Sequence, residues 1–203
     1  MKNKIKNALR YWFGSIFRPK QVFEQFAADE EKLSVSLWIL TLFALLYSIT
    51  SILLYRAGIL PAFDPWMPIA DEQYYLYQTF WTIPWGLATG MMLAGSAHVI
   101  AVLGREDKAY TFEGALSVVT IAWVISSFVL MWLPETVISI FFEGVPWPDW
   151  VEIARLAILA PIWQVLLTVI GIRQTHRVGW WRGIIIGLVT TGLGFLMFLP
   201  FMR

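Results

Sequence analysis

Five long apolar runs organise this chain of 203 residues, and they cover 33–55, 79–103, 109–133, 151–172 and 183–202. A helix needs about 20 predominantly apolar residues to cross the hydrocarbon core of a bilayer, and each run reaches that length. The pattern therefore predicts an all-α integral membrane protein. Its main domain, residues 33–203, is expected to be a five-helix transmembrane bundle.

Residues 1–32 have a different pattern, which predicts a separate cytoplasmic segment. Before Pro19, apolar side chains recur at helical spacing between lysines and arginines: Ile5, Leu9, Trp12, Phe13, Ile16 and Phe17. This spacing predicts an amphipathic helix that lies in the membrane interface. Two interpretations stay open: an element that senses the membrane or docks a partner, and a half-buried start that steadies the bundle.

Composition supports a lipid environment and excludes several kinds of chemistry. Hydrophobic residues make up 58% of the chain and charged residues 14%, whereas a soluble domain has about 25% charged residues. The chain has no cysteine and two histidines, and it lacks the phosphate-binding, zinc-protease and esterase motifs. We therefore expect no catalytic residue, no metal and no cofactor, and we expect the protein not to be an enzyme.

The distribution of basic residues predicts the orientation. The side that holds the N-terminus and the loops at 104–109 and 173–182 carries twelve of the 15 lysines and arginines. Because basic residues near span ends stay in the cytoplasm, the N-terminus should be cytoplasmic and the C-terminus outside. Membrane lipids, rather than nucleic acid, are the expected partners of this basic edge. Its last loop offers Arg173, His176 and Arg177 as candidate residues.

Small residues predict where the helices meet. Gly86, Gly90 and Ala94 follow one another at steps of four in the second run. Gly183 and Gly187 have the GxxxG spacing in the fifth run. Membrane helices pack closely through such faces, although a groove for a lipid tail is an alternative interpretation.

Polar residues inside the runs form the candidate intramembrane cluster, which comprises His98, Glu113, Ser117, Thr120 and Gln164. Such residues face the protein interior or a water-filled cavity. His98 and Glu113 are equidistant from the centre of the predicted hairpin near residues 106 and 107, so we predict that they interact. The pair is either a proton-sensitive switch or part of a polar cavity, or it is a hydrogen bond that fixes the hairpin register.

Three stretches resemble the Yip family, the Ypt/Rab-interacting membrane proteins: FRPKQVFEQF, AHVIAVLGREDKAYTFEGALSVVTIAW and WQVLLTVIGIRQTHRVGWWRGIII. The resemblance implies a five-span layout over nearly the whole chain, and the short N-terminal segment is similar to the prokaryotic branch. It also singles out six positions, which are His98, Thr111, Phe112, Trp163, Gly171 and His176.

The resemblance also bears on function. Eukaryotic relatives bind small GTPases or shape endoplasmic reticulum and Golgi membranes, but a prokaryotic cell has no Rab cycle. We therefore expect a non-enzymatic protein that organises or recruits lipids, a membrane or cytoplasmic protein, or further copies of itself. The alternative is a small transporter or lipid-handling protein with a polar intramembrane cavity, acting as an oligomer.

Overall fold

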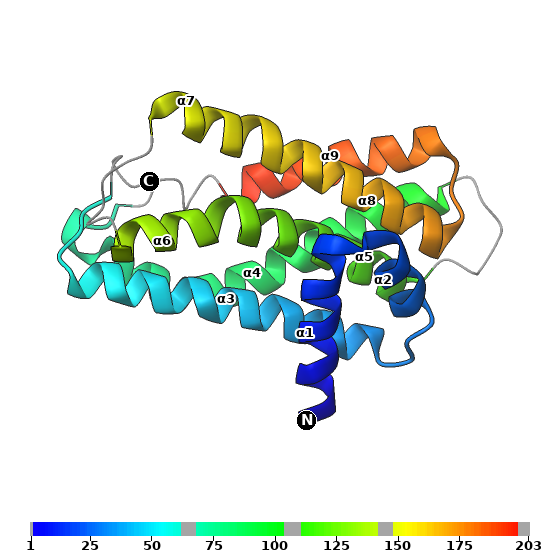
Figure 1. Cartoon of the computed structure of the whole chain (residues 1–203), viewed down its shortest axis with the longest axis horizontal. Helices are drawn as coiled ribbons and strands as arrows, with labels where there is room; N and C mark the ends of the chain where they lie inside the picture. The colour runs from blue at the N-terminus through cyan, green and yellow to red at the C-terminus, as the bar shows by residue number, and fades with distance from the viewer. Residues whose placement is uncertain (1, 62–67, 104–110, 142–147, 199–203) are drawn as a thin grey trace.

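The computed structural model describes residues 2–61, 68–103, 111–141 and 148–198, and all regular secondary structure in these ranges is helical (Figure 1). Five helical rods are long and apolar enough to cross a membrane. The first, second and fifth rods are the single helices α3 (Lys32–Arg56), α4 (Asp71–Val102) and α9 (Trp180–Phe198). The third rod consists of α5 (Phe112–Ser127), the π-helical turn η1 (Phe128–Trp132) and α6 (Leu133–Phe141). The fourth rod consists of α7 (Asp149–Glu152), the π-helical segment η2 (Ile153–Leu159) and α8 (Ala160–His176). This architecture confirms the predicted all-α, five-span fold.

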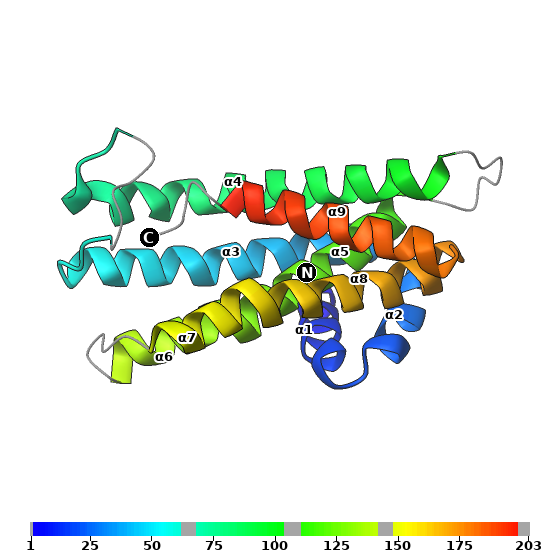
Figure 2. The same ribbon diagram turned by 90° about the horizontal axis from the view of Figure 1, so that it is seen from above.

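The rods lie side by side along the long axis of the molecule (Figures 1 and 2). At one end, on the right in both views, α3, α5 and α9 begin and α4 and α8 end. This is the side to which the sequence assigns most lysines and arginines, and it is called the basic end below.

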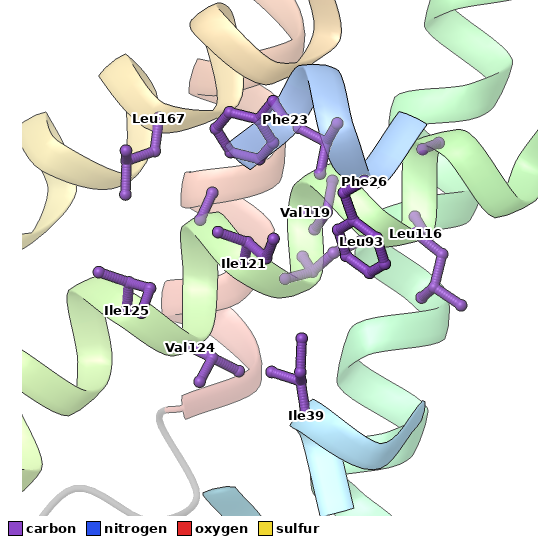
Figure 3. Packing of buried hydrophobic residues seen from close by; sticks show 14 of the residues in the cluster. Phe23, Phe26, Ile39, Leu93, Leu116, Val119, Ile121, Val124, Ile125 and Leu167 are labelled. Atoms are coloured by element: carbon purple, nitrogen blue, oxygen red, sulfur yellow. The ribbon is translucent and has the colours of Figure 1, made fainter. Parts of the chain in front are cut away.

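Helix α5 forms the centre of the bundle. It packs against α3, α4, α8 and α9 and also against the two N-terminal helices. Every residue from Gly114 to Ala122 is buried, which explains why this run is apolar on all sides. Figure 3 shows its side chains among those of four other helices, with Leu116, Val119, Ile121, Val124 and Ile125 from α5 beside Phe23, Phe26, Ile39, Leu93 and Leu167. Polar groups on α5 between Gly114 and Ala122 are therefore enclosed by protein.

Small residues lie where helices approach one another, as the sequence predicts. A Cβ atom built on Gly90 would lie 2.6 Å from Leu40 Cδ1 of α3. One built on Gly187 would lie 3.2 Å from the backbone oxygen of Val165 in α8. These distances leave no room for a side chain unless the neighbour moves, so the glycines allow close packing of α4 on α3 and of α9 on α8.

The N-terminal segment folds into the same core as the spans. Helix α1 (Lys2–Phe17) runs across the direction of the spans (Figure 1), and α2 (Pro19–Ala27) packs against α8. Trp12 is buried, and its ring meets the rings of Phe43 and Phe128 edge to face at 6.1 and 5.2 Å. Phe23 and Phe26 are fully buried. This packing favours the interpretation of a half-buried start that steadies the bundle.

Polar contacts at the start of α3 also hold α1. Lys4 Nζ lies 3.2 Å from the Glu31 carboxylate and donates to the Ser34 hydroxyl. The Tyr11 hydroxyl donates to Asp29 Oδ2 at 2.8 Å. Burial, and after it the hydrogen bond from Tyr11 to Asp29, raises the pKa of Tyr11, so this hydroxyl remains a donor at neutral pH.

Candidate functional site

The two histidines of the chain both lie at the basic end, near the end of α4 and at the end of α8. His176, the last residue of α8, is 1% exposed. Its Nε2 lies 3.2 Å from the carbonyl oxygen of Thr111, and its Nδ1 lies 2.7 Å from the hydroxyl of Thr175. Because a carbonyl oxygen can only accept, Nε2 carries the proton in this contact. His176 therefore connects the end of the fourth rod to the start of the third.

The first turn of α5 is shaped to receive this imidazole. The Thr111 hydroxyl caps the helix by accepting from the Gly114 N–H at 3.1 Å, as threonine does at a helix N-cap. A Cβ atom on Gly114 would lie 3.0 Å from His176 Cε1. Glycine at this position thus lets the ring lie against the helix backbone.

His98 completes this group from α4. Its ring meets Phe112 edge to face, with centroids 6.3 Å apart. Its Nδ1 is buried and has no hydrogen-bond partner within the described ranges. We call His98, Thr111, Phe112, Gly114, Thr175 and His176 the histidine cluster. Four of the six positions singled out by the Yip resemblance belong to it; Trp163 and Gly171 lie elsewhere in α8.

The predicted contact between His98 and Glu113 is not found: no hydrogen bond or ion pair joins them in the part of the chain that the structure describes. Equal distance from a hairpin centre fixes depth in the membrane but not direction around the helix axis. Phe112 faces His98, and Glu113 points about 100° away around the helix axis because an α-helix has about 3.6 residues per turn. Glu113 is half-buried in the first turn of α5.

The other predicted cluster members lie in separate surroundings. Ser117 is buried and donates to the Gly114 carbonyl at 2.8 Å. Thr120 is fully buried, and its hydroxyl has no partner among the described residues. Gln164 instead lines a cavity in the half of the bundle away from the basic end, together with Trp123, Ser126, Ser127, Met131, Leu156, Ala160, Pro161, Thr191, Gly194, Phe195 and Phe198. Ser117 is thus linked to the histidine cluster through Gly114, whereas the described contacts do not join Thr120 or Gln164 to it.

The third rod continues past Pro134, where the sequence pattern ends the span. Pro134 has no N–H to donate to the preceding π-helical turn, in which the Leu133 N–H donates to the Phe128 carbonyl. Arg155, from the π-helical segment η2 of the fourth rod, supplies donors to this turn: Nη1 donates to the carbonyls of Leu130 and Met131 at 3.0 and 3.3 Å. Glu135 lies 3.9 Å from Nη2. We call these contacts the arginine bridge.

Glu152 and Arg155 are three residues apart near the start of the fourth apolar run, a spacing that by itself predicts an interfacial ion pair between them. The side chain of Glu152 lies outside the described residues, and Arg155 is 7% exposed and turned toward η1. An arginine within an apolar run is costly unless it is partnered, and a proline within a span leaves a free carbonyl. Together these two signals could have predicted the bridge.

The loop candidates Arg173 and Arg177 differ in their surroundings. The guanidinium of Arg173 lies over the ring of Trp180, 3.5 Å from its centroid. Arg177 is exposed and ends α8 in the left-handed conformation, with φ 46°. Trp180 and Thr175 were not among the sequence candidates, since neither has a spacing that marks it. In the described residues, no group of three or more His, Cys, Asp or Glu side chains is placed to hold a metal ion.

Removing the donor at His176 should loosen the basic end. We expect His176→Leu to lower the free energy of unfolding by about 1 kcal/mol, because the hydrogen bond from Nε2 to the Thr111 carbonyl is lost and that carbonyl keeps only the Ala115 N–H as a donor. His176→Gln, which keeps an N–H donor, should lose less than half of that. Detergent titration of the purified protein measures both values, and equal losses would contradict the role given to the Nε2–H group.

Comparison with known proteins gives the family. The model of the Yip1 domain matches residues 13–202, which confirms the resemblance drawn from the three stretches. No curated protein and no solved structure matches the chain. The matched residues include all five helical rods described above, the histidine cluster and the arginine bridge. The chain therefore belongs to the Yip1-domain family of multi-pass membrane proteins.

Proposed function

We propose that this Yip1-domain protein is a non-enzymatic scaffold that recruits a partner protein or anionic lipid at its basic end. The observation that carries this proposal is the fixed position of α1. Trp12 and Phe23 are buried in the bundle, whereas Phe13 is 50% and Phe17 82% exposed. The buried face attaches α1 to the spans and leaves the other face available to a partner.

The exposed face of α1 combines apolar and basic groups. Leu9, Phe13 and Phe17 follow one another at steps of four and are exposed, and Lys6 and Arg10 are exposed beside them. Large exposed apolar groups with neighbouring cations are typical of surfaces that bind at a membrane interface. Since α1 crosses the direction of the spans (Figure 1), it has the orientation that an interfacial helix needs.

The membrane and the orientation are part of the proposal. The six positions that the resemblance singles out are those of the prokaryotic branch of the family, and they favour the cytoplasmic membrane of a prokaryotic cell. The excess of lysine and arginine at the basic end favours a cytoplasmic N-terminus and an outer C-terminus. The surface of α1 then faces the leaflet in which anionic lipids attract basic residues.

A lipid-handling role is the alternative, and the cavity at Gln164 favours it. Gln164 Nε2 is buried and has no partner within the described part of the chain. Against this role, Ser117 and Thr120 are enclosed rather than open to water. Pro84 lies inside the continuous α4, and Pro161 begins α8 directly after η2. The broken helices on which a transporter relies are therefore not seen in the described spans.

The variant Phe17→Ser tests the proposal. Because Phe17 is 82% exposed, the change should alter the free energy of unfolding by no more than about 0.5 kcal/mol. We expect native mass spectrometry of protein extracted gently from its membrane to show a stoichiometric protein or lipid partner that is lost in this variant. Trp150→Ser is the matched control, since Trp150 is 72% exposed at the other end of the bundle.

Three outcomes of this experiment contradict recruitment through α1. These are retention of the partner by Phe17→Ser, its equal loss from Trp150→Ser, and its absence from the wild type. A stoichiometric lipid that is lost only when Gln164 is replaced by leucine would instead favour the lipid-handling alternative. A mass of two or more copies would identify the chain itself as the partner.

A further inference from the structure

A groove at the basic end lies between α2, the end of α8 and the start of α9. It is lined by Lys20, Ile170, Arg173, Gln174 and Trp180. Helix α2 packs directly on α8, so the lysine comes from the N-terminal segment and the arginine from the fourth rod. Two cations from separate elements therefore face one concave surface, and among the described residues that line it none is acidic.

Arg173 is held in place but has unused hydrogen-bonding capacity. Its guanidinium stacks on Trp180 at 3.5 Å, an arrangement that fixes the plane of the group. Its Nε is buried and has no hydrogen-bond partner among the described residues. A planar guanidinium with free N–H groups is suited to bidentate binding of phosphate oxygens. The geometry thus favours an anionic ligand with at least two oxygens.

The helix termini around the groove neither add nor remove much charge. The C-terminus of α8 carries a partial negative charge and the N-terminus of α9 a partial positive charge, each about half an elementary charge. These two termini are adjacent, since His176 and Trp180 are four residues apart. Their effects largely offset each other, and the full charges of Lys20 and Arg173 dominate.

The position of the groove indicates that the anion is part of a membrane lipid. It lies where two candidate spans end and begin, at His176 and Trp180. Trp180 is 60% exposed, and tryptophan at the end of a span is typical of the headgroup level. Ile170 and Trp180 supply apolar surface beside the cations. Basic pockets between transmembrane helices at this level bind the headgroups of anionic lipids.

We propose that this groove binds the phosphate-bearing headgroup of an anionic phospholipid. Arg173 and Lys20 donate to the phosphate oxygens, and Trp180 covers the adjoining apolar part of the lipid. The inference rests on the proposed function only in placing the basic end in the cytoplasmic leaflet. It does not depend on α1 or on a protein partner.

Lipid titration of the purified full chain tests the site. Native mass spectrometry should show that phosphatidylglycerol binds more tightly than phosphatidylcholine. Replacing Arg173 or Lys20 with glutamine should each weaken phosphatidylglycerol binding about fivefold, and the double variant about 25-fold, in line with the contribution of one basic residue near a membrane surface. Arg177→Gln is the matched control, because Arg177 is exposed at the same end and does not line the groove.

Different results of this titration would overturn the proposed lipid site in different ways. Equal binding of the two lipids by the wild type would overturn the proposal, and so would an equal loss in Arg177→Gln. Displacement of phosphatidylglycerol by millimolar inorganic phosphate would identify a phosphate-ion site rather than a lipid site. If Arg173→Gln fails to fold, Lys20→Gln still decides, since Lys20 is exposed. A variant that loses the lipid but keeps a protein partner would leave the recruitment proposal intact.

Discussion

Replacing Arg155 with methionine is expected to lower the free energy of unfolding by about 3 kcal/mol. Methionine has a similar length but no donor, so the carbonyls of Leu130 and Met131 lose the Nη1 contact. Hydrogen bonds from a charged donor contribute about 1.5–3 kcal/mol each. Pro134 cannot restore the bond to Leu130, because it has no N–H.

The cost of keeping a cation in the bundle acts in the opposite direction. An arginine at the centre of a membrane helix costs about 2.5–3.5 kcal/mol on insertion scales, but Arg155 is only six residues after the start of α7. This cost is therefore smaller for Arg155, and it is present in the unfolded helices as well. The lost hydrogen bonds consequently outweigh the charge that is removed.

Arg56→Met is the control for this experiment. Arg56 is exposed at the end of α3, so its replacement should change the free energy of unfolding by about 0.5 kcal/mol or less. Titration of both variants with denaturing detergent, followed by circular dichroism, gives the comparison. A similar small effect for Arg155→Met would mean that the bridge does not stabilise the continued third rod.

Replacing Gly171 with valine should cost about 2–3 kcal/mol, the usual range for overpacking a filled core. A Cβ atom at this position would lie 2.5 Å from Val118 Cγ1 and 2.9 Å from Phe23 Cε1. Both neighbours are fully buried, and the branched valine has few alternative rotamers. The clash therefore has to be relieved by separating α8 from α5 and α2.

Gly192→Val is the matched control, because a Cβ atom on Gly192 meets nothing within 4 Å. Its effect should lie within about 0.5 kcal/mol, as for surface substitutions. Thermal unfolding of the two variants in the same detergent measures the difference. Equal stabilities would contradict the close approach of α8 to α5 and α2 that defines the core.

Much of the fold follows from periodicity and length alone. Apolar runs of bilayer length predict the five rods, and glycines at steps of four predict faces that do pack, as Gly90 and Gly187 show. The amphipathic pattern before Pro19 predicts α1, which has one buried and one exposed face. These features depend on local sequence, and a single chain therefore reveals them.

Features that depend on direction around a helix axis were harder to predict. The spacing of His98 gives its depth but not its neighbours, and the structure pairs it with Phe112 rather than with Glu113. The burial of Trp12 likewise could not be predicted from the sequence, since an aromatic residue on an amphipathic helix can face either lipid or protein. The continuation of the third rod past Pro134 depends on Arg155, which lies on a distant part of the chain.

We expect α1 and α2 to belong to the rigid bundle and to make its basic end one fixed surface. Since the chain has no cysteine, spin labels can be attached at two introduced cysteines without background. We would measure the distance distribution between Lys6→Cys and Arg177→Cys in lipid bilayers by pulsed electron paramagnetic resonance, with Leu103→Cys and Arg177→Cys as the reference pair. All three positions are exposed.

If α1 is part of the rigid bundle, the 6/177 pair gives a single distance distribution as narrow as that of the 103/177 pair, and Trp12→Ala broadens only the distribution of the 6/177 pair. A broad 6/177 distribution beside a narrow 103/177 distribution would contradict the claim, because it would show that α1 moves independently of the spans.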